Sequence, residues 1–172
     1  QLQREALQRD VDSAAQQFSA RLTLVREALS VIAVELSAGS ADARRFEVLA
    51  SEMIDSKPEL MSIAHLDGQG RHLSPPVINY VYGPGWDPAS LPEIRDLAEQ
   101  TAAAAHARFA LLDSPRSDFA PVALLIPAAL GDRPPGLLVA LLSLRDLLGT
   151  GITPEMLDRY RFTVMQDDRV LL

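Results

Sequence analysis

The sequence predicts an α+β fold in which one antiparallel sheet packs against a long N-terminal helix. Two observations support this prediction. Apolar residues over positions 7–36 recur at gaps of three and four, which is the period of an α-helix with one buried face. Between positions 60 and 144, short apolar runs are separated by turn-forming residues and by one helical segment, which is typical of antiparallel strands.

The composition excludes several classes of protein. The 172 residues are 48% hydrophobic and 23% charged, which suits one globular domain with an appended helix. The net charge of −7 and the scattered basic residues argue against nucleic-acid binding, which needs clustered lysines and arginines. Because cysteine is absent, disulfides, thiolate metal sites and cysteine nucleophiles are excluded. No apolar run reaches the roughly 18 residues of a membrane span, and no signal peptide is visible.

The first predicted element is a helix over Leu7–Leu36, about 45 Å long and therefore longer than a small domain is wide. Its apolar seam comprises Leu7, Val11, Ala14, Phe18, Leu22, Val25, Leu29, Ile32 and Leu36. We expect its last turns to lie along the core of the chain's own domain, and its first half to project and pair with a partner helix. Residues 1–39 are therefore predicted to be a stalk that forms a homodimer. Because Gln1 already lies in the helical pattern, we interpret the chain as a fragment of a longer protein.

A second helix and a hairpin follow the stalk. Gly39 predicts the end of the first helix, and Ser40 is expected to cap the second. The stretch LMSIAHLDGQGRHL, residues 60–73, then predicts a β-hairpin with Gly68 and Gln69 at its tip.

The rest of the domain is predicted to be a loop, a helix and three strands. A loop broken by proline and glycine leads to a helix that has Pro92 in its first turn. Strands are expected at residues 108–113, 121–130 and 136–144, and short helical pieces at 144–149 and 153–160. We assign residues 40–149 to one domain. Residues 150–172, which end in a second strand–turn–strand pattern, either close this domain or open another.

The order of these segments resembles a known group of sensors. PELMSIAHLDGQGRHLSPP, residues 58–76, resembles the opening hairpin of extracytoplasmic PAS-like sensor domains of the CHASE and Cache groups. GWDPASLPEIRDLAEQTAAAAHARFALLDSP, residues 85–115, is similar to the helix and strand that follow in CHASE domains. APVALLIPAALGDRPPGLLVALLSLRDLLG, residues 120–149, resembles their final strands and short helix. The resemblance implies a PAS-like antiparallel sheet with the long helix as its stalk.

This resemblance implies a periplasmic ligand-sensing domain of an inner-membrane receptor: a two-component sensor histidine kinase first, with a diguanylate cyclase or a chemoreceptor-like protein as the other parents. A small molecule would bind between sheet and loop and alter the stalk, no cofactor would be needed, and flanking segments outside this chain would enter the membrane. Amino-acid-binding Cache domains carry an arginine just before a tryptophan. Here YVYGPG precedes Trp86, so an amino-acid ligand is not supported. A cytoplasmic PAS- or GAF-like regulatory module and a small metal-dependent enzyme are the alternatives.

Five residues are candidates for ligand binding. Tyr80, Tyr82 and Trp86 lie in the proline- and glycine-rich loop, and aromatic side chains with a polar tip suit the lining of a small-molecule cavity. They could instead plug the open end of the sheet. Arg108 and Asp113, at the two ends of a predicted strand, could face a charge on the ligand or be solvated surface charges.

Two histidines are weak candidates for binding zinc or copper. His65 and His72 face each other in the predicted hairpin register and would share a face, but a closed site needs a third or fourth ligand and only Asp67 is near. We therefore expect no metal site. The sequence contains no G-x-S-x-G, no H-E-x-x-H and no phosphate-binding glycine loop, so we expect this chain not to be an enzyme.

Overall fold

The computed structural model describes residues 1–39, 42–104, 106–112, 120–128, 136–149, 165–166 and 169–170. Its α-helices are α1 (Leu2–Ser37), α2 (Ala43–Ser56), α3 (Pro92–Ala104) and α4 (Leu144–Gly149), and two 3₁₀ turns are η1 (Tyr80–Tyr82) and η2 (Pro88–Ser90). Its strands are β1 (Leu60–Leu66), β2 (Val77–Ile78), β3 (Arg108–Leu111), β4 (Pro121–Ala128), β5 (Gly136–Ser143), β6 (Met165–Gln166) and β7 (Arg169–Val170). The α+β class is confirmed; the predicted helical piece at 153–160 lies outside the described residues.

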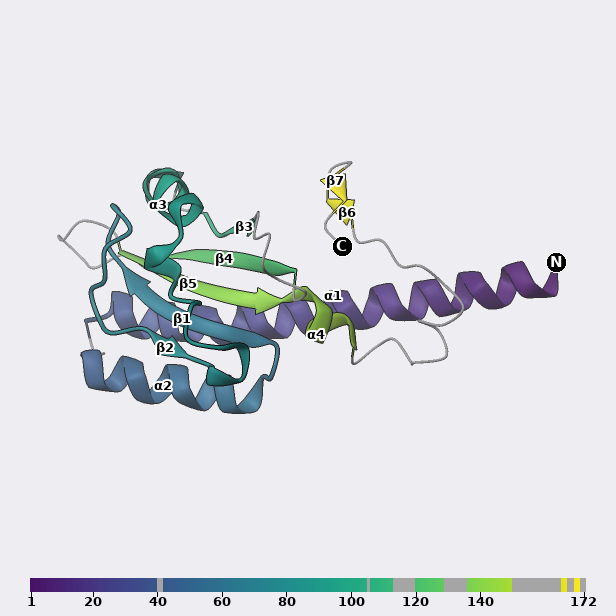
Figure 1. Cartoon of the computed structure of the whole chain (residues 1–172), viewed down its shortest axis with the longest axis horizontal. Coiled ribbons are helices and arrows are strands. Elements are labelled where there is room, and N and C mark those ends of the chain that lie inside the picture. Colours follow the sequence, from purple (N-terminus) through teal and green to yellow (C-terminus); the bar gives the residue numbers. More distant parts are fainter. Residues whose placement is uncertain are drawn as a thin grey trace.

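Five strands form one antiparallel sheet in the order β2-β1-β5-β4-β3 (Figure 1). β5 lies at its centre, between β1 and β4. Every residue of β1 and β5 is buried, because other elements cover both faces of the sheet. This double burial explains why these strands appear in the sequence as almost continuous apolar runs. β6 and β7 pair with each other, in the segment where a strand–turn–strand was predicted.

α1 and α2 cover one face of the sheet. Leu29 and Ile32 of α1 are at most 2% exposed and Phe46 of α2 is fully buried, and all three belong to one apolar cluster. The sheet contributes Leu60, Ile63, Leu124, Ile126, Ala128, Leu138, Ala140 and Leu142 to this cluster. The prediction that the last turns of the long helix lie along the domain's own core is therefore confirmed.

α3 and η2 cover the opposite face. Ile94 and Ala98 lie one turn apart on α3 and are fully buried, and Ala89 of η2 is 9% exposed. They pack with β4 and β5 residues Ala123, Leu125, Leu137, Val139 and Leu141. α3 is thus held by the four-residue spacing of its apolar side chains.

α1 continues past the end of the sheet toward the N-terminus (Figure 1). Its 36 residues correspond to a length of about 54 Å. On the side away from the sheet, Leu24, Val31 and Val34 are 56%, 59% and 67% exposed. The C-terminal half of α1 therefore carries two apolar stripes, one buried in the core and one in solvent. No helix in the described part of the chain is both long enough and apolar enough to cross a membrane.

The junction between α1 and α2 differs in one detail from the prediction. Gly39 ends α1 with φ of +67°, as expected for a glycine after a helix. The cap of α2 is Asp42, whose carboxylate accepts a hydrogen bond from the backbone N–H of Arg45 at 2.8 Å. The predicted cap, Ser40, lies outside the described residues.

The hairpin that opens the sheet is one residue out of the predicted register. Leu66 forms a bridge with His72, so three residues, 68–70, make up the tip. Gly70 has φ of +79°, the left-handed conformation that closes a three-residue tip. The predicted pairing of positions 65 and 72 is therefore wrong. Because neighbouring strand positions point to opposite faces, His65 and His72 lie on opposite sides of the hairpin.

Candidate functional site

A cleft of about 460 Å³ lies between the tip of the β1 hairpin and the start of α3. Its lining residues are Gln69, Gly70, Arg71, His72, Ala89 and Arg95. Two of them carry a permanent positive charge, a third can be protonated, and no carboxylate is among them. The cleft is therefore lined by two arginines, while the nearby carboxylates Asp67 and Asp87 are paired with Arg71 and His72 in its walls.

Asp67 organises the hairpin wall of the cleft. Its Oδ1 accepts hydrogen bonds from the backbone N–H groups of Gln69 and Arg71, both at 2.9 Å, and its Oδ2 lies 3.0 Å from Nε of Arg71. Burial acts to raise the pKa of Asp67, but these backbone hydrogen bonds and the Arg71 guanidinium outweigh it and hold the pKa below its ordinary value. The charged carboxylate of Asp67 thus stabilises the turn and holds Nε of the Arg71 guanidinium.

Gly70 allows the hairpin tip to touch α3. A Cβ atom at this position would lie 3.3 Å from both Cα and Cγ of Arg95, and the φ of +79° disfavours any other residue. The hairpin backbone and the Arg95 side chain are therefore in direct contact at the floor of the cleft.

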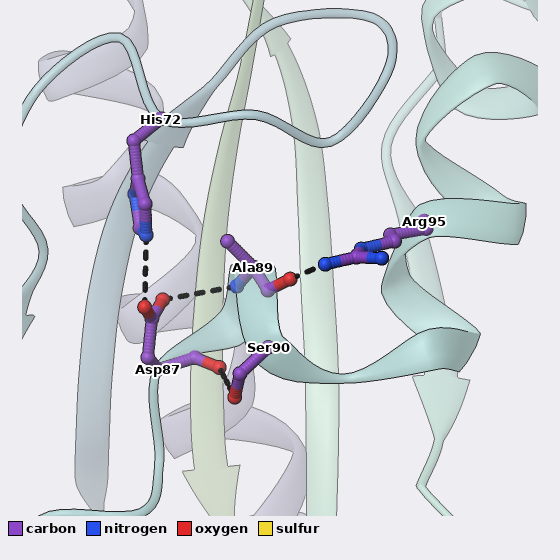
Figure 2. A network of polar contacts seen from close by, with 5 residues as sticks. All are labelled: His72, Asp87, Ala89, Ser90 and Arg95. Atoms are coloured by element: carbon purple, nitrogen blue, oxygen red, sulfur yellow. Dashed lines mark hydrogen bonds and ion pairs between the residues drawn. The ribbon is translucent and has the colours of Figure 1, made fainter.

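The second wall is a chain of hydrogen bonds through η2 (Figure 2). Nε2 of His72 lies 2.8 Å from Oδ2 of Asp87, and because a carboxylate only accepts, this ring nitrogen carries the hydrogen. Asp87 Oδ1 accepts from the N–H of Ala89 at 3.0 Å, and the Asp87 carbonyl accepts from the hydroxyl of Ser90 at 2.7 Å. Nε of Arg95 then donates to the carbonyl of Ala89 at 3.3 Å. One network joins the hairpin to α3.

Arg95 is the least compensated charge of the cleft. Its Nε is engaged by the Ala89 carbonyl, which leaves the two terminal NH₂ groups of the guanidinium. Within the part of the chain that the structure describes, Arg95 forms no ion pair. The nearby carboxylates Asp67 and Asp87 form their hydrogen bonds within the walls, and neither forms an ion pair with Arg95.

Of the four predicted ligand-binding residues that the structure describes, Tyr82 and Trp86 lie together, and Tyr80 and Arg108 lie apart from them. Tyr80 is 77% exposed, whereas Tyr82 is 9% exposed and packs in the apolar cluster under α3. Trp86 packs against the same cluster and donates its Nε1–H to the carbonyl of Tyr82 at 2.9 Å. These contacts favour the alternative that Tyr82 and Trp86 plug the end of the sheet. Arg108 lies on the β3 edge, across the sheet from β2.

Arg108 and Asp113 have different outcomes. Nη1 of Arg108 donates to Oε1 of Gln100 on α3 at 3.2 Å, which ties the β3 edge to that helix. Asp113 lies outside the described residues, so its role stays a prediction. Among the described residues, none of the ligand-binding candidates lines the cleft, whereas the weak metal candidate His72 does.

The weak metal candidates His65 and His72 do not form a pair. His72 faces Asp87 at the cleft, whereas the ring of His65 contacts the ring of Phe46, with centroids 5.9 Å apart, on the α2 side. Across the described ranges, no group of three or more histidine, aspartate and glutamate side chains could hold a metal ion. The idea of two imidazoles sharing a face fails because the hairpin tip contains three residues.

His65 is a buried titratable group that leads to a pH prediction. It is 6% exposed, its Nε2 has no hydrogen-bond partner among the described residues, and burial lowers its pKa. An unfolded chain binds a proton at this ring near pH ~6.5, whereas the folded chain resists it, so the free energy of unfolding should fall as pH drops below that value. The expected slope is at most about 1.4 kcal/mol per pH unit.

The replacement His65→Leu should remove this part of the acid sensitivity. Urea unfolding at several pH values between 7 and 5 measures it, with His106→Leu, at an exposed position, as the matched control. An unchanged slope in His65→Leu would contradict the prediction.

The residues that build the cleft were missed at the sequence level. Arg71 and Arg95 are separated in the sequence by β2 and two 3₁₀ turns, and arginine is an ordinary residue at exposed positions. The available signal was the DGQGRH turn: a glycine placed to accept left-handed backbone next to two basic residues. No periodicity indicates which later helix such a turn will meet.

Comparison with models of known protein families found no match, and a search of the curated proteins found no significant relative.

Proposed function

We propose that this chain is the extracytoplasmic ligand-sensing domain of a transmembrane receptor, with a two-component sensor histidine kinase as the parent. In this proposal the domain lies in the periplasm, flanking segments enter the inner membrane, and the chain works as a homodimer through α1. The chain itself carries out no catalysis.

The observation that carries the proposal is the double role of α1. Its C-terminal half is part of the domain's core, with Leu29 and Leu36 at most 2% exposed, while its N-terminal half extends past the sheet. A rearrangement of the sheet must therefore displace a rod that reaches beyond the domain. The five-stranded sheet is antiparallel and packs against the long helix, which supports the proposal because the sequence resemblance implies these two features.

The mechanism is a shift between two arrangements of the domain. A ligand that binds one arrangement more tightly increases the population of that arrangement, and the shift is set by the ratio of its affinities for the two. In this proposal, α1 transmits the change in arrangement to the parent protein. The cleft between hairpin and α3 is where the ligand binds in this proposal. β1 connects the cleft to α1. The tip of its hairpin borders the cleft, and its residues Leu60 and Ile63 pack in the apolar cluster that contains α1.

The outer stripe of α1, Leu24, Val31 and Val34, is the proposed dimer surface. These residues lie seven and three positions apart, as do the a and d positions of a coiled coil. Because the predicted seam residues Val25, Leu29, Ile32 and Leu36 are buried in the chain's own core, they are not available to a second copy. The outer stripe has the spacing and the exposure that a partner helix needs.

A thermal-shift screen of small metabolites against the purified chain tests the sensing function. A ligand present at a hundredfold excess over its Kd adds about 2.7 kcal/mol to the free energy of unfolding, which raises Tm by several degrees. If a library that covers anionic, neutral and cationic compounds gives no stabilisation, ligand sensing is refuted. Membrane spans encoded on both sides of this segment in the full gene would support the transmembrane parent, and their absence would count against it.

A further inference from the structure

We infer that the cleft between the β1 hairpin and α3 binds a small oxyanion, a carboxylate or a phosphate, with Arg95 as its principal contact and Arg71 and His72 on the opposite wall. This names the ligand class of the sensing function proposed above and rests on that proposal only for its biological meaning. The binding itself can be tested without any signalling output.

Arg95 has the geometry of an anion receptor. The hydrogen bond from its Nε to the Ala89 carbonyl, at 3.3 Å, and the close contact with Gly70 restrict the side chain. A planar guanidinium held in this way presents its terminal N–H groups as a fork, which matches two oxygens of a carboxylate or phosphate. Restraint before binding also reduces the entropy lost when the anion binds.

The hairpin wall supplies further donors. The Arg71 guanidinium is held at its base by Asp67, at 3.0 Å, and its side chain remains 73% exposed. His72 lines the cleft while its Nε2 faces Asp87. Positive groups therefore flank the cleft on both sides, and both carboxylates nearby are already hydrogen-bonded within the walls.

The lining favours an anion over other ligands of the same size. A cation would meet the guanidinium of Arg95, which forms no ion pair among the described residues, whereas the charge of Arg71 is offset by Asp67 at 3.0 Å. An apolar molecule would find only Ala89 as an apolar side chain in the lining. A cleft of about 460 Å³ is within the range of small-molecule sites. Its size and donors suit a compact, charged metabolite.

The experiment is an NMR titration of the ¹⁵N-labelled chain with sodium succinate and, separately, with sodium phosphate, at constant ionic strength. Choline chloride serves as the salt control. We expect either anion to shift the amide resonances of residues 69–72 and 87–95, and the stronger of the two identifies a carboxyl or a phosphoryl ligand. The replacement Arg95→Gln should weaken binding about tenfold to a hundredfold, because it removes charge-assisted hydrogen bonds.

Arg45→Gln is the matched control. Arg45 is an exposed arginine of α2, paired with Glu35 at 3.4 Å, and α2 packs on the opposite face of the sheet. It should leave the affinity for both anions unchanged. The spectra of both variants also report whether the fold is retained, which is expected because both side chains are exposed.

Three outcomes would overturn the inference: no shift in the cleft with either anion, equal affinity in Arg95→Gln and wild type, or equal weakening by Arg45→Gln. Each of them leaves the sensing proposal to be judged separately. If neither anion shifts the cleft resonances while a neutral or cationic compound stabilises the chain in the thermal-shift screen, the sensing proposal stands and the oxyanion inference is refuted.

Discussion

Replacing Val31 and Val34 together by glutamate is expected to convert the proposed dimer into a monomer. Both side chains point away from the sheet and are 59% and 67% exposed, so the change does not disturb the core. In a symmetric pair of α1 helices, each position meets its own counterpart, and the double variant places four new carboxylates in one seam. Carboxylates buried at the helix–helix interface would lose their hydration and repel one another, so we expect association to weaken at least about a hundredfold.

Sedimentation velocity over a range of concentrations measures this effect. Val48→Glu is the matched control, since Val48 is an apolar residue of α2 that is 41% exposed and lies outside the stripe. It should leave the sedimentation coefficient unchanged, and all variants should keep their unfolding free energy within about 0.5 kcal/mol. A wild-type chain that stays monomeric at every concentration would refute the dimer. A double variant that still dimerises would place the interface elsewhere on the chain.

The apolar residues of α1 form two stripes, one buried in the domain's core and one exposed, and the test addresses the exposed stripe. The three- and four-residue periodicity correctly found the residues of α1 that are buried from Val25 to Leu36, because a helix that packs on one sheet turns one apolar face toward it. Val11, in the part of the predicted seam nearer the N-terminus, is 41% exposed. The periodicity did not assign the outer residues Leu24, Val31 and Val34, which lie between the seam residues in the sequence. Only the position of the sheet determines which of the two stripes is free. Glu27 lies between Leu24 and Val31, so we place the tightest contact at Val31 and Val34.

The long strands were predictable because a proline or a glycine marks where each apolar run begins. β4 begins at Pro121 and β5 at Gly136, and both are continuous apolar runs that belong in a doubly covered sheet. The short edge strand β2, Val77–Ile78, follows two prolines and has no such signal. It forms because the backbone of β1 offers unpaired groups on that side.

The hairpin register and the cleft depend on which glycine of the turn adopts the left-handed conformation. DGQG contains two glycines, and either could adopt left-handed backbone; the choice of Gly70 over Gly68 shifts the pairing by one residue. That shift separates His65 from His72 and places Arg71 and His72 at the cleft. The sequence therefore predicted the sheet and the long helix better than it predicted the cleft, which depends on tertiary contacts between the turn and α3.

The hydroxyl of Tyr82 is expected to contribute about 2 kcal/mol to stability. It lies 2.7 Å from the carbonyl of Pro58 and 2.6 Å from Oδ2 of Asp146, on a side chain that is only 9% exposed. Burial, together with the nearby Asp146 carboxylate, raises the pKa of Tyr82, so the phenol stays protonated and can donate. The replacement Tyr82→Phe removes the one O–H donor that lies within hydrogen-bond distance of both the Pro58 carbonyl and the Asp146 carboxylate.

Tyr80→Phe is the matched control, because its side chain is 77% exposed and should change the unfolding free energy by less than about 0.5 kcal/mol. Urea denaturation of both variants without ligand measures the difference. The comparison decides between two roles for the loop aromatics. A loss of stability in Tyr82→Phe, with anion affinity unchanged, assigns Tyr82 to fastening the loop onto α4. Unchanged stability combined with a lost ligand response would instead return Tyr82 to the ligand site and move that site away from Arg95.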